Sequence, residues 1–132
     1  MAHDKKISIA AGAWGQDVEP WLAQALATAT LEDLREQHQA GAVLFRVLFD
    51  GATVGAFLLR VDDTPQGKEG VIVAAAAALE GVDMIATVMP IIESRFQGVR
   101  AIRYHTQKPA LVRKMARLGY VAQEVICVKV IA

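Results

Sequence analysis

The dipeptide Asp50-Gly51 stands between two apolar runs, VLFRVLF and TVGAFLLRV. Both runs are rich in β-branched and aromatic residues, which are typical of strands. Glycine accepts the positive φ that a tight hairpin turn requires. The pattern therefore predicts two antiparallel strands joined at this turn, and the rest of the fold has to be built around them.

Upstream of the hairpin, residues 18–40 have the periodicity of helix, and we expect two short helices there. The first of these helices is expected to have an apolar face that includes Leu22. Thr30 and Asp33 are spaced as in a pattern close to the capping box, so the second helix is expected to start at Thr30. Gly41 is expected to end this helical region.

Downstream of the hairpin, the polar stretch DDTPQGKEG (62–70) is interpreted as a loop. The stretch VIVAAAAAL (71–79) follows. Alanine favours helix over strand, but the β-branched start and the break at Gly81 favour a third antiparallel strand. Small side chains on such a strand would let a helix or a ligand approach closely.

The remaining elements follow from the same periodicities. Residues 82–97 predict a helix capped by Asp83 and kinked at Pro90. Next come a strand at 99–106, a helix at 108–120 and a strand at 122–131. The predicted order is α-α-β-β-β-α-β-α-β, with a possible short first strand at residues 6–10. We therefore predict an α/β (α+β) fold with a mixed sheet.

Composition narrows the class of protein. The chain has 132 residues, of which 54% are apolar, and this favours one domain over residues 1–132. Lys+Arg and Asp+Glu number 14 each, so the chain has no net positive charge that would favour a nucleic-acid partner. No stretch predicts a signal peptide or a membrane helix. The expected location is the cytoplasm.

Metal and disulfide chemistry have little support in the sequence. Cys127 is the single cysteine, so an intrachain disulfide is excluded, and a buried, inert thiol is expected. His3, His38 and His105 do not have metal-ligand spacing. We expect no metal.

Two local patterns carry a resemblance. In FDGATVGAFLLRV, the Asp-Gly turn is followed by Val54-Gly55, and in ALVRKMARLGYV a helix ends in Gly119-Tyr120. With the element order, they make residues 42–131 resemble the GNAT family of N-acetyltransferases. The chain is also similar to small GNAT-like proteins encoded in phage and prophage genomes. The resemblance implies a GNAT-like fold, acetyl-CoA or another acyl-CoA as cofactor, and an amine acceptor.

In that family, an Arg or Gln followed by Gly-x-Gly or Gly-x-Ala lets backbone amides at a helix start hold the pyrophosphate of CoA. The matching stretch here, AAAALEGVDMIAT, has one glycine, Gly81, and two carboxylates, Glu80 and Asp83. Like charges oppose an anion by about 1 kcal/mol in water and by several kcal/mol in a drier site. The signature is therefore degraded, and Asp83 is better explained as a helix cap.

An exposed strand edge can still pair with the pantetheine arm of CoA through backbone contacts. The cofactor-binding residues that the resemblance implies are Ala77, Ala78, Leu79, Gly81 and Val82.

The catalytic residues stay unassigned. The family's tyrosine proton donor corresponds to Met115, whose thioether donates no proton, and its asparagine corresponds to Lys108. His105 is a candidate base, but a surface or capping role is favoured, and Tyr104 is expected to be core. A basic cluster is interpreted mainly as a solvated face, with anion binding as the alternative. It consists of Arg100, Arg103, Lys108, Arg113, Lys114 and Arg117.

Two hypotheses follow. The first is an acyl-CoA-dependent N-acyltransferase of unknown acceptor. The second is a catalytically inactive GNAT-fold binding or assembly protein, because fold alone does not decide function. The alternating final stretch EVICVKVI, if it lies at a sheet edge, would allow a homodimer.

Overall fold

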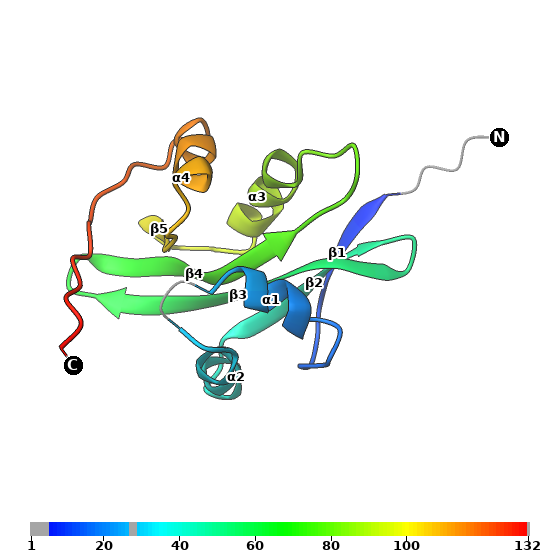
Figure 1. Ribbon diagram of the computed structural model, residues 1–132, viewed down its shortest axis with the longest axis horizontal. Coiled ribbons are helices and arrows are strands. Elements are labelled where there is room, and N and C mark those ends of the chain that lie inside the picture. The colour runs from blue at the N-terminus through cyan, green and yellow to red at the C-terminus, as the bar shows by residue number, and fades with distance from the viewer. Residues whose placement is uncertain (1–5, 27–28, 132) are drawn as a thin grey trace.

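The computed structural model describes residues 6–26 and 29–131. Four helices and five strands are formed within these ranges (Figure 1). In chain order they are β1 (Ile7–Ala11), α1 (Glu19–Gln24), α2 (Leu31–Gln39), β2 (Val43–Phe49), β3 (Ala52–Thr64), β4 (Gly67–Ala77), α3 (Met84–Ser94), β5 (Ala101–Tyr104) and α4 (Pro109–Ala116).

The strands form one sheet in the order β1-β2-β3-β4-β5. Neighbouring strands are antiparallel except β4 and β5, which are parallel. The predicted α/β fold with a mixed sheet is therefore confirmed. The possible first strand is also present, as β1 paired with β2.

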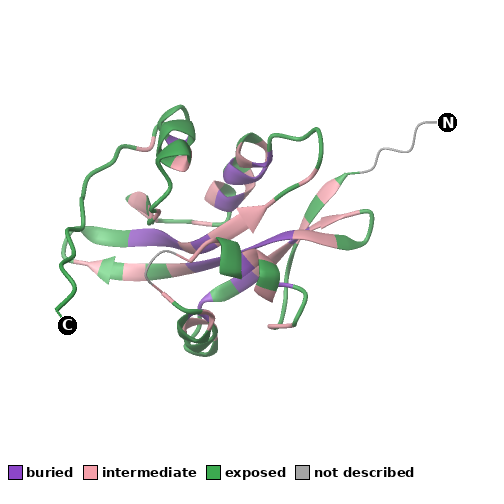
Figure 2. Cartoon of the chain, in the orientation of Figure 1, coloured by how far each residue is buried: buried purple, intermediate pink, exposed green. Residues whose placement is uncertain are grey.

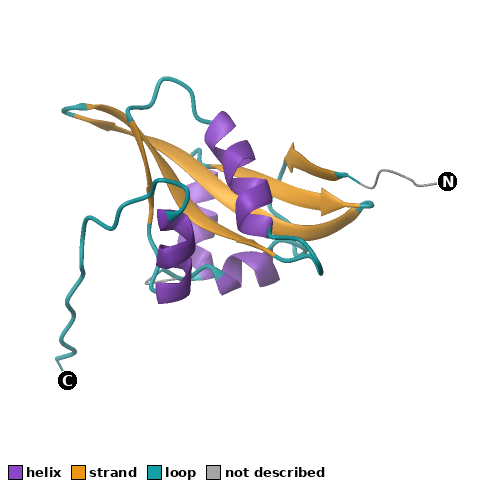
Figure 3. Cartoon of the chain, turned by 90° about the horizontal axis from the view of Figure 1, so that it is seen from above, coloured by secondary structure: helices purple, strands orange, loops and turns teal. Residues whose placement is uncertain are grey.

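Helices cover both faces of the sheet. α1 and α2 lie on one face, and α3 and α4 lie on the other (Figures 1 and 3). Each face has its own apolar core. Leu22, Leu34 and Leu58 belong to the α1 and α2 side, whereas Phe57 and Ile92 belong to the α3 side. The buried residues follow the middle of the sheet and the inner faces of the helices (Figure 2).

The first hairpin forms where the sequence predicts it. Asp50 and Gly51 both have positive φ, 52° and 80°. Two consecutive residues with positive φ give the tight turn whose twist matches that of antiparallel strands. The local turn chemistry thus fixes the pairing of β2 with β3.

The stretch 62–70 is not the predicted loop. β3 continues to Thr64 and β4 begins at Gly67, so only Pro65 and Gln66 form the turn. The Thr64 hydroxyl bonds across it, donating to the Gly67 carbonyl oxygen at 2.6 Å.

Two acidic residues of this stretch are paired: Asp62 with Arg60 of the same strand and Arg103 of β5, and Glu69 with Arg100 and Arg103. Polarity therefore does not mark a loop here.

The predicted helix starts hold closely, whereas α3 ends at Ser94 and α4 at Ala116, three and four residues before the predicted ends. Thr30 and Asp33 form a complete capping box, with each side chain accepting from the other residue's amide. Asp83 caps α3, accepting from the Ala86 amide at 3.2 Å. Pro90 lies inside α3. No helix in the described ranges has the length and apolar character needed to cross a membrane.

The final strand predicted at 122–131 is wrong. These residues have no secondary structure and are exposed. Cys127 is exposed with them, not buried as predicted. An alternating pattern indicates extended chain, but a strand also needs a neighbouring strand, and none of the strands in the described ranges pairs with this segment.

Candidate functional site

The parallel pair β4 and β5 is joined at one end only. Its register runs from Glu69 opposite Ala101 to Ile72 opposite Tyr104. β5 ends there, whereas β4 continues to Ala77. The last part of β4 therefore has a free edge, a feature that would give an extended ligand somewhere to lie.

The backbone groups on that edge can be assigned from the opposite pairing. The Ala78 amide donates to the Val54 carbonyl oxygen on β3 at 3.0 Å. Because alternate residues of a strand direct their amides to opposite sides, the amide and carbonyl groups of Ala75 and Ala77 point away from β3. They are donors and acceptors available to a ligand at the open edge.

The alanine run also lets β3 and β4 approach closely. A Cβ at Gly55 would lie 2.7 Å from the Ala76 carbonyl oxygen and closer still to the Ala77 Cβ. No side chain fits in that space, so Gly55 is required for close contact. This glycine belongs to the Val54-Gly55 pattern noted in the sequence, and the structure gives it a packing role.

A hollow of about 680 Å³ opens where β4 passes into α3. Its lining residues are Ala77, Ala78, Leu79, Glu80, Val82, Asp83, Met84, Ile85 and Lys114. Four of the five residues that the sequence suggested for cofactor contact are among them. The fifth, Gly81, forms the adjoining turn with a φ of 76°.

The start of α3 directs backbone donors at this hollow. The first intrahelical bond runs from the Thr87 amide to the Asp83 carbonyl oxygen at 3.0 Å. The amides of Met84 and Ile85 precede it and have no carbonyl of the same helix to bond. They lie at the positive end of the helix dipole, a favourable place for an anion.

The charges around the hollow partly oppose that preference. Glu80 and Asp83 are exposed carboxylates at its rim, and the Asp83 side chain already caps the Ala86 amide. Lys114 of α4 supplies a positive charge at the same hollow. The sequence placed Lys114 only in a basic cluster, because nothing local indicates that α4 reaches the start of α3.

The other members of that basic cluster lie elsewhere. Arg100 and Arg103 both form ion pairs with Glu69, and Arg103 also binds Asp62 at 3.1 Å. Glu69 is buried, so this network joins β3, β4 and β5 at the closed end of the strand pair. Hydrogen bonding to Arg60, and the charges of Arg60 and Arg103, lower the pKa of Asp62.

Met115 stands where the GNAT resemblance would place a tyrosine proton donor, and it belongs to the apolar core. Met115 is buried and packs in the cluster under α3. Tyr120 donates its hydroxyl hydrogen to Glu93 on α3 at 2.8 Å. Burial and this contact with Glu93 raise the pKa of Tyr120 well above its usual range, so the phenol stays protonated. Tyr120 therefore anchors the end of α4.

The loop between β5 and α4 reaches the opposite face of the sheet. The Lys108 ammonium donates to the Gln24 carbonyl oxygen at the end of α1, at 2.9 Å. Tyr104 is half-buried, and burial raises its pKa. His105 is exposed. Neither Tyr104 nor His105 lines the hollow at α3; both line the groove along the outer edge of β5.

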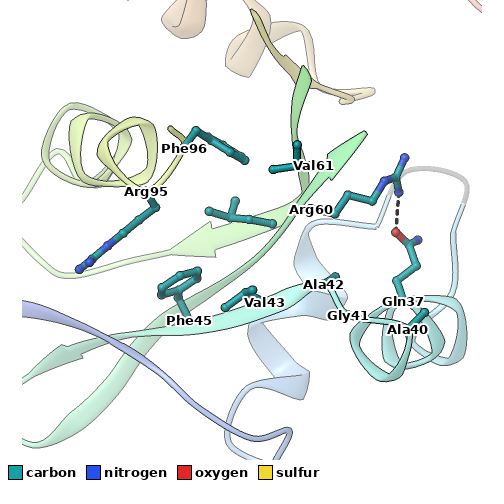
Figure 4. Close-up of a pocket in the computed structure, with 11 residues that line it drawn as sticks. Gln37, Ala40, Gly41, Ala42, Val43, Phe45, Arg60, Val61, Arg95 and Phe96 are labelled. Atoms are coloured by element: carbon teal, nitrogen blue, oxygen red, sulfur yellow. Dashed lines mark hydrogen bonds between the residues drawn. The ribbon is translucent and has the colours of Figure 1, made fainter. Parts of the chain in front are cut away.

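A separate hollow of about 580 Å³ lies at the other end of α3 (Figure 4). Its floor includes Phe45, and the Arg95 guanidinium lies over that ring at 5.7 Å from the centroid. Arg60 at its rim is held by Gln37 and Asp62. Because Arg60 is already paired, the hollow offers mainly the apolar surface of Ala42, Val43, Phe45 and Leu59.

Metal chemistry finds no support in the side chains. Across residues 6–26 and 29–131, no three His, Cys, Asp or Glu side chains are grouped closely enough to hold a metal ion.

Comparison with known proteins identifies the fold. No family model and no curated protein matches the chain by sequence. Among solved structures, it is similar to a ribosomal-protein-alanine N-acetyltransferase from Brucella melitensis, with a TM-score of 0.70, 16% identity, and coverage of 96% of this chain and 99% of the other. A GNAT-family acetyltransferase from Streptococcus pneumoniae has a TM-score of 0.67 and 16% identity, with coverage of 94% of this chain and 98% of the other. An acetyltransferase from Trypanosoma brucei has a TM-score of 0.66 and 18% identity, with coverage of 96% of this chain and 100% of the other.

These likenesses extend over nearly the whole chain. The GNAT-like N-acetyltransferase fold that the sequence patterns suggested is therefore confirmed. At identities of 16 to 18% they establish the fold alone.

Proposed function

We propose that this chain binds an acyl-CoA in the hollow between the open end of β4 and the start of α3, and that it transfers the acyl group to an amine. The observation that carries the proposal is the early end of β5, which leaves the backbone groups of Ala75 and Ala77 free at an open edge. The solved structures of the same fold from Trypanosoma brucei and Brucella melitensis, both acetyltransferases, support it.

The hollow fits the chemistry of such a cofactor. The amide and carbonyl groups on the β4 edge match the amide groups of a pantetheine arm. The amides of Met84 and Ile85, together with Lys114, offer donors and positive charge to a pyrophosphate. Glu80 and Asp83 weaken that attraction, so we expect a lower affinity than a site without carboxylates would give.

When bound, an acyl-CoA supplies an activated thioester. The protein's part is to hold that thioester and an amine within reach of each other, which can lower the barrier by about 7 to 11 kcal/mol when the geometry is right. An amine held there would bond through its nitrogen to the thioester carbonyl carbon while the carbon–sulfur bond breaks and CoA leaves as a thiolate. The amine would lose its proton to solvent, and solvent would protonate the thiolate. Met115 cannot protonate the departing sulfur.

A second candidate is a GNAT-fold protein that binds without catalysis. Met115 favours it, because a buried thioether fills the position where the family has its proton donor. Tyr120 favours it as well, since its hydroxyl is committed to Glu93.

A two-step experiment separates the candidates. Thermal unfolding is followed with acetyl-CoA and with CoA, where a ligand at 100 times its Kd should stabilise the fold by about 2.7 kcal/mol. Release of free CoA thiol is then measured with a panel of amines, in the Cys127→Ser variant so that the exposed cysteine does not contribute.

Stabilisation with amine-dependent thiol release supports the transferase. Stabilisation without release supports the non-catalytic candidate. The absence of any thermal shift at millimolar ligand rejects acyl-CoA binding and with it the transferase.

A further inference from the structure

Helix α3 covers only part of its side of the sheet. Val43 of β2 lies directly opposite Leu59 of β3, so their side chains share a face, and by alternation Phe45 and Val61 lie on that face as well. Phe45 and Leu59 pack into the core under α3, but α3 ends at Ser94. Val43 and Val61 are left 46% and 51% exposed. Apolar side chains gathered in this way mark an interaction site more often than single ones do.

These side chains belong to the hollow of about 580 Å³ at the end of α3 (Figure 4). Phe96 forms its wall on the α3 side, and the Phe96 ring lies so close to β4 that a Cβ at Gly70 would come within 2.7 Å of it. In the floor, the Phe45 ring stacks on that of Phe57 with centroids 4.9 Å apart. The volume falls in the range of small-ligand pockets, about 300 to 1,000 Å³, and packing within the chain already forms the walls.

The hollow carries one positive charge that no carboxylate neutralises. Its charged lining residues are Arg60 and Arg95, and they lie on opposite sides of it (Figure 4). Arg60 is already bonded to Gln37 and, through two nitrogens, to the Asp62 carboxylate. Arg95 lies over the Phe45 ring and forms no ion pair with any described residue. Its guanidinium can therefore hold a carboxylate through two parallel N–H donors.

The carboxylate nearest to Arg95 in the chain is committed elsewhere, because Glu93 accepts from the Tyr120 hydroxyl. The two ends of α3 thus differ in charge: Glu80 and Asp83 oppose an anion at its start, whereas the lining at its end holds no carboxylate. We infer that the hollow at the end of α3 is a binding site for a small molecule with an apolar body and one carboxylate. The carboxylate lies on Arg95 and the body on the apolar floor.

A second copy of the chain fits this hollow less well. In a two-fold contact the same patch meets itself, so two Arg95 guanidinium groups would come together without a carboxylate between them. The end of α2, with Gln37 and Ala40, also bounds the hollow on the side away from α3. The inference does not depend on acyl-CoA binding, since that proposed site lies at the opposite end of α3.

A ligand pair that differs only in charge tests the inference on the unaltered protein. The probe is 3-phenylpropanoate, and the control is 3-phenylpropan-1-ol, which has the same apolar body without the carboxylate. In spectra of the ¹⁵N-labelled chain, the acid should shift the amides of Val43, Val61 and Phe96 with a Kd on the order of 1 mM. The alcohol should bind about 5-fold more weakly, because it makes no charged contact with Arg95.

Two variants with matched controls locate the site. Arg95→Gln should raise the Kd of the acid about 5-fold and leave that of the alcohol unchanged, whereas Arg113→Gln, an exposed arginine outside the lining, should leave both unchanged. Val61→Asp places a carboxylate on the floor and should raise the Kd of the acid more than about 10-fold. Val112→Asp, at a valine of α4 that is 40% exposed, should have no effect.

The comparison of acid with alcohol needs no variant, so it stands even if Val61→Asp does not fold. Equal affinity for the two ligands overturns the inference, and so does an Arg95→Gln chain that binds the acid as the unaltered chain does. Shifts centred on Met84 and Ile85, or no shifts at tens of millimolar acid, overturn it as well. It is also overturned if light scattering shows a dimer that Val61→Asp dissociates, because a second copy would then occupy the hollow.

Discussion

The two ends of the β4–β5 pair are built in opposite ways. At its start, buried Glu69 forms ion pairs with Arg100 and Arg103, so charge joins the strands. At its end, β5 has stopped and β4 continues as a run of alanines. A sheet can thus keep an opening when its strands are held together at one end and small side chains leave the other end free.

Substitutions at Gly55 should have the largest effect, because they crowd the open end. Gly55→Ala places a Cβ 2.7 Å from the Ala76 carbonyl oxygen. A backbone atom of a paired strand cannot rotate away from this contact as a side chain could. We expect a loss of about 1 to 3 kcal/mol in the free energy of unfolding, measured with urea. Gly70→Ala is the matched change at the closed end, where the new methyl meets the Phe96 ring at 2.7 Å.

A ring can shift more readily than a strand, so Gly70→Ala should cost less than Gly55→Ala. If Gly70→Ala costs as much or more, close contact between β3 and β4 is not what Gly55 provides.

The next largest effect is expected from the ion pairs at the closed end. Glu69→Ala removes the carboxylate that Arg100 and Arg103 share. Both arginines are partly exposed, so we expect a loss of about 1 to 2 kcal/mol, less than for a fully buried network. Glu80→Ala, an exposed carboxylate at the open end, should change stability by no more than about 0.5 kcal/mol. Equal effects would mean that Glu69 does not join the strands.

Acid should weaken the closed end through Asp62. Arg60 and Arg103 lower the pKa of Asp62 in the folded chain. A lowered pKa contributes stability above the unfolded-state value of about 3.9, and this stability is lost as pH falls through the folded value. The difference in unfolding free energy between the unaltered chain and Asp62→Asn should therefore be largest at neutral pH and shrink below about pH 4.

Chemical denaturation at a series of pH values measures this difference. A gap between the two chains that stays constant down to pH 2 would show that the ion pairs at Asp62 do not stabilise the fold.

The smallest effects concern charge at the hollow. Lys114→Ala should weaken acetyl-CoA binding about 2- to 5-fold, because one exposed charge contributes about 0.5 to 1 kcal/mol. Glu80→Gln should strengthen binding to a similar extent. Arg113→Ala is the matched control, since it removes the same charge from the neighbouring position on α4, outside the lining of the hollow. Isothermal titration compares them, and an equal loss for Arg113→Ala would mean that only net charge matters.

Local signals predicted much of this structure. The turn at Asp50-Gly51 and the capping box at Thr30 depend on residues a few positions apart, and both are present. The misinterpreted stretch 62–70 depends on distant residues, because Glu69 pairs with Arg100, just before β5, and Asp62 pairs with Arg103 of β5. Polarity alone could not reveal those partners.

The same limit applies at the candidate site. Ala77 and Val82 follow each other closely in the chain, so a sequence pattern could place them together, whereas Lys114 reaches the hollow only through the packing of α4. Residues 122–131 have a strand pattern, yet that pattern carries no information about which edge such a strand would join. The strand predicted there is not formed.

In the proposed function, the open end of β4, and not the closed end, receives an acyl-CoA. Titration of the ¹⁵N-labelled chain with acetyl-CoA tests it residue by residue. We expect the amide signals of Ala75, Ala77, Met84 and Ile85 to shift with a common Kd, while those of residues 69–72 stay in place. Unchanged spectra at millimolar acetyl-CoA, or shifts centred on residues 69–72, would contradict it.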